Sequence, residues 1–309
     1  MTYSIPAYVD NYLSYLSKKG RSPATLKQYS SDLSKFIMWM NDYKGSNNFD
    51  TLFLLTEDDL KNYLKYLYNR DISEATIRRL FAVLNRFLQH MDIYMDTLLE
   101  ISKAHPLRPL SKEDFISDEE FEKLIISMKK PNESTARDYL IERNLSIVLF
   151  ARYYGLTPKD ISSITMDKIN LAQKTIDIRT PDSIIKIQLK DEHIQYIRDY
   201  RNSIEEKCRP RFGSKDPLFV AFFNLTCRYY YDNTFGMPKA LTIRGIQEMI
   251  KDEVKLAGLR KISAKHLRNS CILEHLSKGL ATNSVVSFFR LAGPFSLHRY
   301  KEYLNNQSK

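Results

Sequence analysis

The sequence predicts a mainly α-helical protein of two domains, the second of which carries a small three-stranded antiparallel sheet. Two features of the 309 residues support this fold class. Long stretches repeat apolar side chains every three or four positions, as on one face of an α-helix. Three short runs are instead rich in β-branched or aromatic residues, as in strands. A chain of this length is also more often two domains than one.

The first hundred residues predict a bundle of four amphipathic helices. Ser22 is suited to be an N-cap because Pro23 follows it at the first helical position. Thr56 and Ser73 are caps of the same kind for two further helices. The expected helices cover residues 5–19, 21–40, 56–67 and 73–91. We therefore expect a first domain over residues 1–102.

A segment with two prolines, several basic side chains and no helical period predicts a linker over residues 103–113. We expect the second domain over residues 114–309, beginning with a capping box of Ser117 and Glu120. The strand-like runs cover residues 174–180, 183–189 and 216–223. Helices are expected over residues 139–154, 242–259, 264–276, 283–291 and 296–306.

Positive charge is concentrated in the second domain. The whole chain has a net charge of +10, whereas residues 1–105 hold thirteen Lys and Arg against twelve Asp and Glu. An excess of this size attracts polyanions, and nucleic acid is the commonest polyanion in a cytoplasm. The charge therefore favours a nucleic-acid partner.

Several classes of protein are disfavoured. The N-terminus lacks a basic start followed by an apolar run, and Arg152 interrupts the most apolar stretch, so we expect a cytoplasmic protein without membrane association. Cys208, Cys227 and Cys271 lack the spacing of a disulfide framework or a structural zinc site. We therefore expect no metal and no cofactor.

Three stretches resemble segments of the tyrosine recombinase (phage integrase) family. "SKKGRSPATLKQYSSDLSKF" is similar to the opening helix pair of that family. "VLFARYYGLTPKDISSITMDKIN" resembles its "YTGLR-SEL" segment, and "KISAKHLRNSCILEHLSKGL" resembles its "PHDLRHTFATHLLEAG" segment. The resemblance covers nearly the whole chain. It implies a core-binding (SAM-like) domain, followed by a domain of the catalytic type, which together bind double-stranded DNA.

In that family two arginines hold the scissile phosphate, and a lysine and two histidines (or a tryptophan in place of the second) handle protons and charge. A tyrosine forms a covalent 3′-phosphotyrosine. Guanidinium groups suit this task because they neutralise the charge that develops on phosphoryl oxygens. The resemblance places Arg268 on the second arginine and Tyr300 on the nucleophile, with Tyr303 as the fallback for the nucleophile. Four positions are substituted, namely Thr157, Arg179, Lys265 and Leu291. Pro158 follows Thr157, so Thr157 is better explained as the N-cap of a helix.

These substitutions predict a protein without recombinase activity, since losing one preorganised donor costs on the order of 10²–10³ in rate. We expect a sequence-specific DNA-binding regulator of transcription, similar to the integrase-like repressors of temperate phages that control lysogeny. A divergent, active site-specific recombinase with Tyr300 as nucleophile is the first alternative. An interaction subunit of a recombination or regulatory complex is the second.

The same alignment gives candidate DNA contacts, most of them basic side chains on the predicted DNA-facing elements. They are Arg21, Lys27, Arg78, Arg79, Arg86, Lys159, Arg179, Lys265, Arg268 and Tyr300. Besides double-stranded DNA, self-association and a regulatory peptide or protein are the partners considered. The operator sequence, the oligomeric state and any effector that releases DNA stay open.

Overall fold

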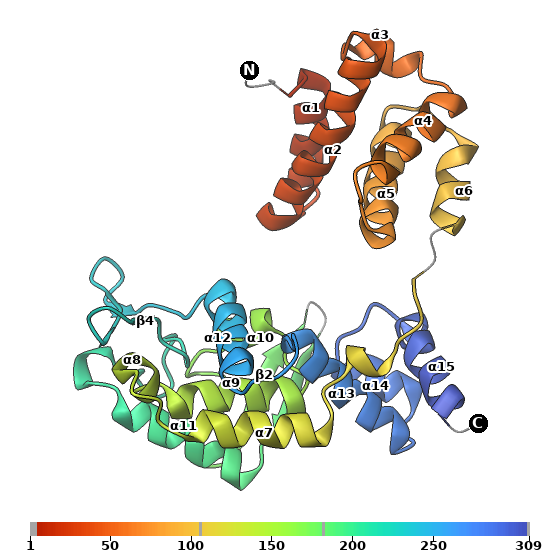
Figure 1. The fold of residues 1–309 in the computed structure, drawn as a ribbon. Coiled ribbons are helices and arrows are strands. Elements are labelled where there is room, and N and C mark those ends of the chain that lie inside the picture. Colours follow the sequence, from red (N-terminus) through yellow and green to blue (C-terminus); the bar gives the residue numbers. More distant parts are fainter. Residues whose placement is uncertain (1–4, 105–106, 181–182, 308–309) are drawn as a thin grey trace. The chain divides into compact units, whose positions relative to one another are not determined.

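The computed structural model of the chain describes residues 5–104, 107–180 and 183–307 (Figure 1). The chain divides into two compact units, Met1–Arg108 and Pro109–Lys309. A separate hydrophobic core stabilises each unit. Across the described ranges, no helix is long and apolar enough to cross a membrane.

The first unit is helical. Its elements are α1 (Ala7–Lys18), α2 (Pro23–Lys44), α3 (Phe49–Phe53), α4 (Glu57–Tyr68), α5 (Glu74–His90) and α6 (Asp96–Ala104). The predicted caps Ser22, Thr56 and Ser73 each accept a hydrogen bond from a backbone N–H of the first turn. The four predicted helices are therefore present, and α3 and α6 are two short additions to them.

The core of the first unit is built from aromatic and aliphatic side chains of its longer helices. Phe36 of α2 packs edge-on against Tyr63 of α4, with ring centroids 5.1 Å apart, and Phe81 and Phe87 of α5 are fully buried. The carboxylate of Glu57 accepts hydrogen bonds of 2.9 Å from the first two backbone amides of α6. This contact attaches α6 to α4.

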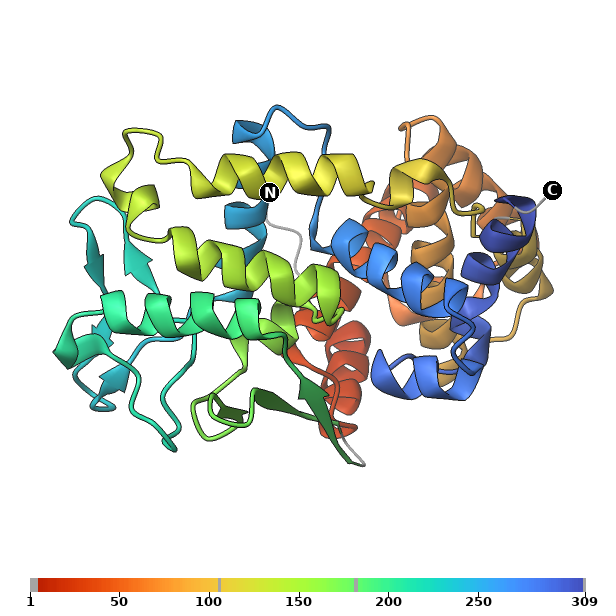
Figure 2. The same cartoon turned by 90° about the horizontal axis from the view of Figure 1, so that it is seen from below.

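The second unit is also mainly helical. Its helices are η1 (Lys112–Asp114), α7 (Asp118–Lys129), α8 (Thr135–Asp138), α9 (Ile141–Tyr153), α10 (Pro158–Ser162), α11 (Asp191–Ser203), η2 (Glu206–Cys208), α12 (Ile243–Leu256), α13 (Ala264–Ser277), α14 (Thr282–Phe288), η3 (Pro294–Leu297) and α15 (His298–Gln307). Helix α9 is central, since it packs against α7, α11, α12 and α13 (Figure 2). Its residues from 143 to 152 are all buried, which explains its continuous apolar run.

A three-stranded antiparallel sheet of order β1-β2-β3 completes this unit, formed by β1 (Ile169–Asn170), β2 (Thr175–Arg179) and β3 (Ile184–Gln188). Two further two-stranded pairs are β4 (Phe222–Phe223) with β5 (Arg228–Tyr229), and β6 (Tyr231–Asp232) with β7 (Met237–Pro238). The predicted strand over residues 216–223 is mostly irregular. Its core side chains, Leu218 to Val220, are buried, whereas Phe223 is exposed.

The predicted fold class is therefore confirmed. The segment expected to be a linker, residues 103–113, begins inside α6 and ends inside η1. Residues 105 and 106 of that segment lie outside the described residues.

Candidate active site

Helix α13 carries the basic side chains Lys265, His266 and Arg268, and its start is fixed by His266. The Ser263 backbone N–H donates a 3.0 Å hydrogen bond to Nδ1 of His266, completing a capping box. His266 therefore caps its own helix. Burial is the main cause that lowers the pKa of His266, and the neighbouring Arg260 lowers it further. Lys265, one residue earlier, is exposed to solvent.

Arg268 is half-buried one turn into α13 and joins two distant segments. Its guanidinium donates to the backbone carbonyl of Gly155, between α9 and α10, and to that of Phe289, directly after α14. The Phe289 ring lies below the same guanidinium at 5.6 Å. Burial, and then the charge of Arg290, lower the pKa of Arg268. Two repelling cations thus lie near each other at this point.

The approach of Phe289 to Gly155 explains why a glycine is present. Gly155 has φ of +58°, and a β-carbon there would overlap the Phe289 ring. Phe289 itself is fully buried, with no exposed surface. The end of α14 can therefore pack directly on the segment before α10, bringing its carbonyls within reach of Arg268.

Thr157 has the structural role that the sequence indicates for it. It caps α10 in a box with Asp160, whose carboxylate accepts hydrogen bonds of 2.8 Å from the Thr157 N–H and 2.7 Å from its hydroxyl. The same carboxylate oxygen accepts a 2.7 Å hydrogen bond from Arg290. Arg290 is a residue that sequence reasoning missed. Asp160 links the cap of α10 to the segment after α14.

Tyr300 on α15 lies against α13. Its hydroxyl donates a 2.8 Å hydrogen bond to the side-chain oxygen of Asn269, the neighbour of Arg268. Burial raises the pKa of the Tyr300 hydroxyl, while the positive charge of Arg268 counteracts that rise. Tyr303, the fallback position, packs instead on Phe115 at a ring distance of 4.7 Å. Of these two tyrosines, Tyr300 is the one whose hydroxyl bonds to α13.

The other residues that the sequence assigns to the site are spread over several elements of the second unit. Leu291 packs on the small apolar cluster that includes Cys271, Val285 and Phe289. Arg179 is exposed at the end of β2, next to residues 181–182, which lie outside the described residues. Lys159 is exposed on α10. The structure thus brings together Arg268, Tyr300 and the Thr157 cap.

In the first unit, two candidate DNA contacts also have partners inside the unit. Arg79 forms an ion pair with the buried Asp32, and Arg86 donates a 2.7 Å hydrogen bond to the Tyr29 hydroxyl. Both side chains nevertheless keep exposed surface. Arg78 is half-buried and engaged in contacts of its own, whereas Arg21 and Lys27 are exposed. Each of the two paired arginines is therefore held by a partner on α2.

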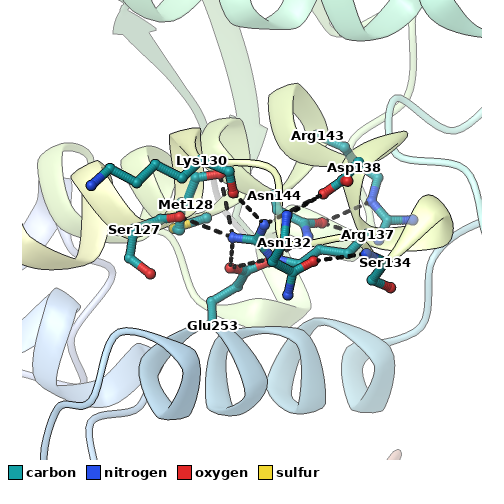
Figure 3. Close-up of polar contacts among 10 residues, drawn as sticks. All are labelled: Ser127, Met128, Lys130, Asn132, Ser134, Arg137, Asp138, Arg143, Asn144 and Glu253. Carbon is teal, nitrogen blue, oxygen red and sulfur yellow. Dashed lines mark hydrogen bonds and ion pairs between the residues drawn. The ribbon is translucent and has the colours of Figure 1, made fainter.

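A second polar cluster of the second unit is joined by internal hydrogen bonds (Figure 3), and its members Arg143, Asn144 and Glu253 are buried. Glu253 of α12 accepts hydrogen bonds of 2.9 Å from Arg137 and 3.0 Å from the Asn144 amide, one on each carboxylate oxygen. Asn144 in turn accepts from Arg143, which also donates to the Val220 carbonyl. Because these buried groups have partners, the cluster joins α8, α9 and α12 rather than offering groups to a ligand.

Within the residues that the structure describes, no group of three or more His, Cys, Asp or Glu side chains is placed to hold a metal ion. The three cysteines are free thiols. Burial raises the pKa of Cys271, the cysteine nearest Arg268, to about 12. This thiol is therefore protonated at neutral pH. The polar groups gathered near Arg268 are thus guanidinium, hydroxyl, amide and carboxylate groups.

Residues 9–91 match the family described as phage integrase, N-terminal SAM-like domain. A tyrosine recombinase XerC of Staphylococcus haemolyticus is 24% identical over 290 residues, which cover 93% of this chain and 88% of that protein. A tyrosine recombinase XerC of Staphylococcus epidermidis is 26% identical over 299 residues, with the same coverage of 93% and 88%.

Two solved structures share the fold. The XerH site-specific recombinase bound to a palindromic difH substrate gives a TM-score of 0.69 at 19% identity, covering 94% of this chain and 80% of that chain. The Tn1549 transposon integrase in complex with transposon right end DNA also gives 0.69, at 13% identity, covering 95% and 94%.

These relatives contradict the expectation of a regulator without recombinase activity, and that prediction is wrong. The similar proteins are named recombinases, and none of those compared here is named a repressor. The expectation rested on the residues substituted along the chain, whereas Arg290 donates to the carboxylate of Asp160 beside Thr157, although the two residues are 130 positions apart.

Proposed function

The chain has the tyrosine recombinase family fold, and from this premise we propose that it is a site-specific recombinase of double-stranded DNA. One observation carries the proposal. The Tyr300 hydroxyl bonds to Asn269, the residue next to Arg268 on α13, and the half-buried guanidinium of Arg268 is near enough for its charge to act on the pKa of Tyr300. A phosphodiester bound there would meet a nucleophile and a positive charge together.

In the proposed reaction, the Tyr300 oxygen attacks the phosphorus of a DNA phosphodiester. The new bond is a 3′-phosphotyrosine, and the bond that breaks frees a 5′-hydroxyl on the neighbouring nucleotide. The Tyr300 proton passes to solvent water as the bond forms, and the departing 5′-oxygen takes up a proton from Lys265. The attack is reversible because a second 5′-hydroxyl can displace the tyrosine, which joins a new strand without an external energy source.

Arg268 contributes in two ways. Its charge favours the deprotonated form of Tyr300 against the burial that raises the pKa of that hydroxyl. Its guanidinium also stabilises negative charge on the phosphoryl oxygens. Lys265, exposed three residues earlier, is the proposed proton donor to the 5′-oxygen.

DNA binding is proposed to rest on phosphate contacts, which give affinity that depends strongly on salt. The proposed contacts are the basic residues that the sequence identified in both units: Arg21, Lys27, Arg78, Arg79, Arg86, Lys159, Arg179 and Lys265. Exchange between two DNA sites needs a nucleophile at each broken strand. We therefore propose that copies of the chain associate on DNA, in the cytoplasm where the DNA lies.

A trapped covalent intermediate tests the proposal. Genomic segments recovered by crosslinking with the full-length chain would be made as duplexes nicked one nucleotide from the candidate cleavage position, so that religation is blocked. The wild-type chain is expected to form an adduct stable to denaturing gels. Tyr300→Phe should abolish the adduct, whereas Tyr303→Phe, the matched control, should keep it. The absence of any wild-type adduct on segments that are bound specifically would overturn the proposal.

A further inference from the structure

We infer that Arg290 is a second phosphate-binding guanidinium of this site, held on Asp160 until a DNA phosphate takes the place of that carboxylate. The inference rests on the proposed function, because it names a further residue of the same site. It assigns to the segment after α14 a role that its sequence does not reveal.

The backbone at Arg290 is the first argument. Helix α14 ends in a Schellman motif, in which the Leu291 N–H donates to the Val286 carbonyl and the Arg290 N–H to the Ser287 carbonyl, both at 3.0 Å. Arg290 has φ of +53°, the left-handed conformation that glycine normally occupies at this position. A strained conformation kept by a large side chain indicates that the side chain has a function there.

The second argument is that Arg290 and Arg268 connect the same two segments. Arg268 donates to the carbonyls of Gly155 and Phe289. Arg290 donates to the Asp160 carboxylate at 2.7 Å and to the Phe288 carbonyl at 3.1 Å. The two guanidinium groups therefore lie between the same two segments of the second unit. Consistent with this, the charge of Arg290 lowers the pKa of Arg268.

The charge balance is the third argument. Asp160 supplies one negative charge, and one of its oxygens already accepts from the Thr157 N–H and hydroxyl. Arg290 is bonded to it, Arg268 is near enough for the Asp160 charge to act on its pKa, and the exposed Lys159 adjoins it in the chain. A phosphodiester brings one further negative charge and free acceptor oxygens, which a guanidinium fork binds bidentately.

The exchange needs little rearrangement. Asp160 keeps the two bonds from Thr157 when Arg290 leaves, so α10 stays capped. Arg290 is 15% exposed and its partner Asp160 20% exposed at the side chain, so the ion pair is reachable from solvent. Arg290 would thus supply positive charge beside Thr157, the site at which the sequence lacks an arginine.

Four variants of the full-length chain test the inference on the nicked duplexes described above. Arg290→Gln removes the charge, and Arg290→Gly removes it while relaxing the left-handed backbone. Asp160→Asn frees Arg290. Arg211→Gln breaks an ion pair with Asp216 elsewhere in the unit and is the matched control. The measurements are the rate of adduct formation and the slope of binding affinity against salt concentration.

Both Arg290 variants are expected to slow adduct formation by about 10² or more and to reduce the salt slope by about one phosphate contact. Asp160→Asn should bind DNA more tightly with a steeper slope, and Arg211→Gln should match the wild type. If both Arg290 variants formed the adduct at the wild-type rate and kept the wild-type salt slope, the inference would be overturned. If the wild type formed no adduct, the proposed function would fail. The salt slopes would still decide whether Arg290 binds phosphate.

Discussion

The Tyr300 hydroxyl donates a hydrogen bond of 2.8 Å to the side-chain oxygen of Asn269, whose amide in turn donates to the Asp114 carbonyl at 3.0 Å. Asn269 is buried, with 4% of its surface exposed. The amide therefore fixes the position of the tyrosine relative to Arg268, its neighbour on α13. This relationship makes Asn269 a positioning residue for the proposed nucleophile.

Replacing Asn269 by Ala tests that role. The Tyr300 hydroxyl would lose its acceptor, so we expect adduct formation to slow by about 10-fold to 10²-fold, as for a misplaced reacting group. Unfolding free energy should fall by about 1–3 kcal/mol, because the Asp114 carbonyl loses its donor. The salt slope of DNA binding should stay unchanged, since no phosphate contact is removed. If Asn269→Ala lowered the salt slope of DNA binding and left the rate of adduct formation unchanged, the positioning role would be contradicted.

Glu253 is expected to be essential for stability rather than for chemistry. Its truncation to Ala would leave the guanidinium of Arg137 buried without its carboxylate, at a cost of about 3–5 kcal/mol in unfolding free energy. Glu248→Ala is the control on the same helix, because the partners of Glu248 are solvent-exposed, and it should cost at most about 1 kcal/mol. Urea unfolding measures both. Equal losses in the two variants would argue against the buried network.

We predict that the stability of the protein depends on pH through His193. The Lys190 N–H donates to the Tyr154 hydroxyl, which leaves that hydroxyl to donate to Nδ1 of His193 at 2.7 Å. Burial lowers the pKa of His193 to about 4. The folded chain therefore keeps His193 neutral, while the unfolded chain protonates it below about pH 6.5. Stability from this group is present above pH 6.5 and is lost as pH falls toward 4.

Urea unfolding at pH 7.5 and 4.5 would measure this effect. The wild type should lose about 2 kcal/mol more than His193→Gln between the two values, since glutamine does not titrate. Other acidic groups titrate equally in both proteins, so the difference isolates His193. Parallel losses would show that the histidine is protonated in the folded chain.

Gly155 is expected to tolerate no side chain. Gly155→Ala combines a left-handed backbone with overlap of the Phe289 ring, so it should cost about 2–5 kcal/mol and slow adduct formation by displacing a partner of Arg268. Gly279→Ala is the matched control, because φ there is +75° but nothing lies within 4 Å of the added carbon. It should cost about 1–2 kcal/mol. Thermal unfolding and adduct assays distinguish the two variants.

Much of the fold was predictable because its signals are local. Ser22 and Thr56 precede the helices they cap, and Thr157 was correctly interpreted as a cap from the proline and acid that follow it. The strand over residues 216–223 was predicted less well. Its apolar side chains are buried by the helices around them, so hydrophobicity there reports burial rather than pairing with another strand.

In the candidate site, too, some residues could be predicted from local sequence and others could not. Arg268 and Tyr300 were candidates from the sequence because their segments resemble those of the tyrosine recombinase family. His266 adjoins Lys265, the position at which the resemblance places a histidine, and its ring caps the helix on which it stands. Arg290 gave no signal, because its significance depends on Asp160, a partner 130 residues away.

The sequence by itself determined most of the longer helices and several of their caps, since apolar period and capping residues act within a few positions of one another. Only the tertiary structure decided which charged side chains lie close together. The packing of Phe289 against Gly155 brings the end of α14 to the start of α10. That contact sets Arg290 beside Arg268, and no property of either arginine's neighbours in the chain specifies it.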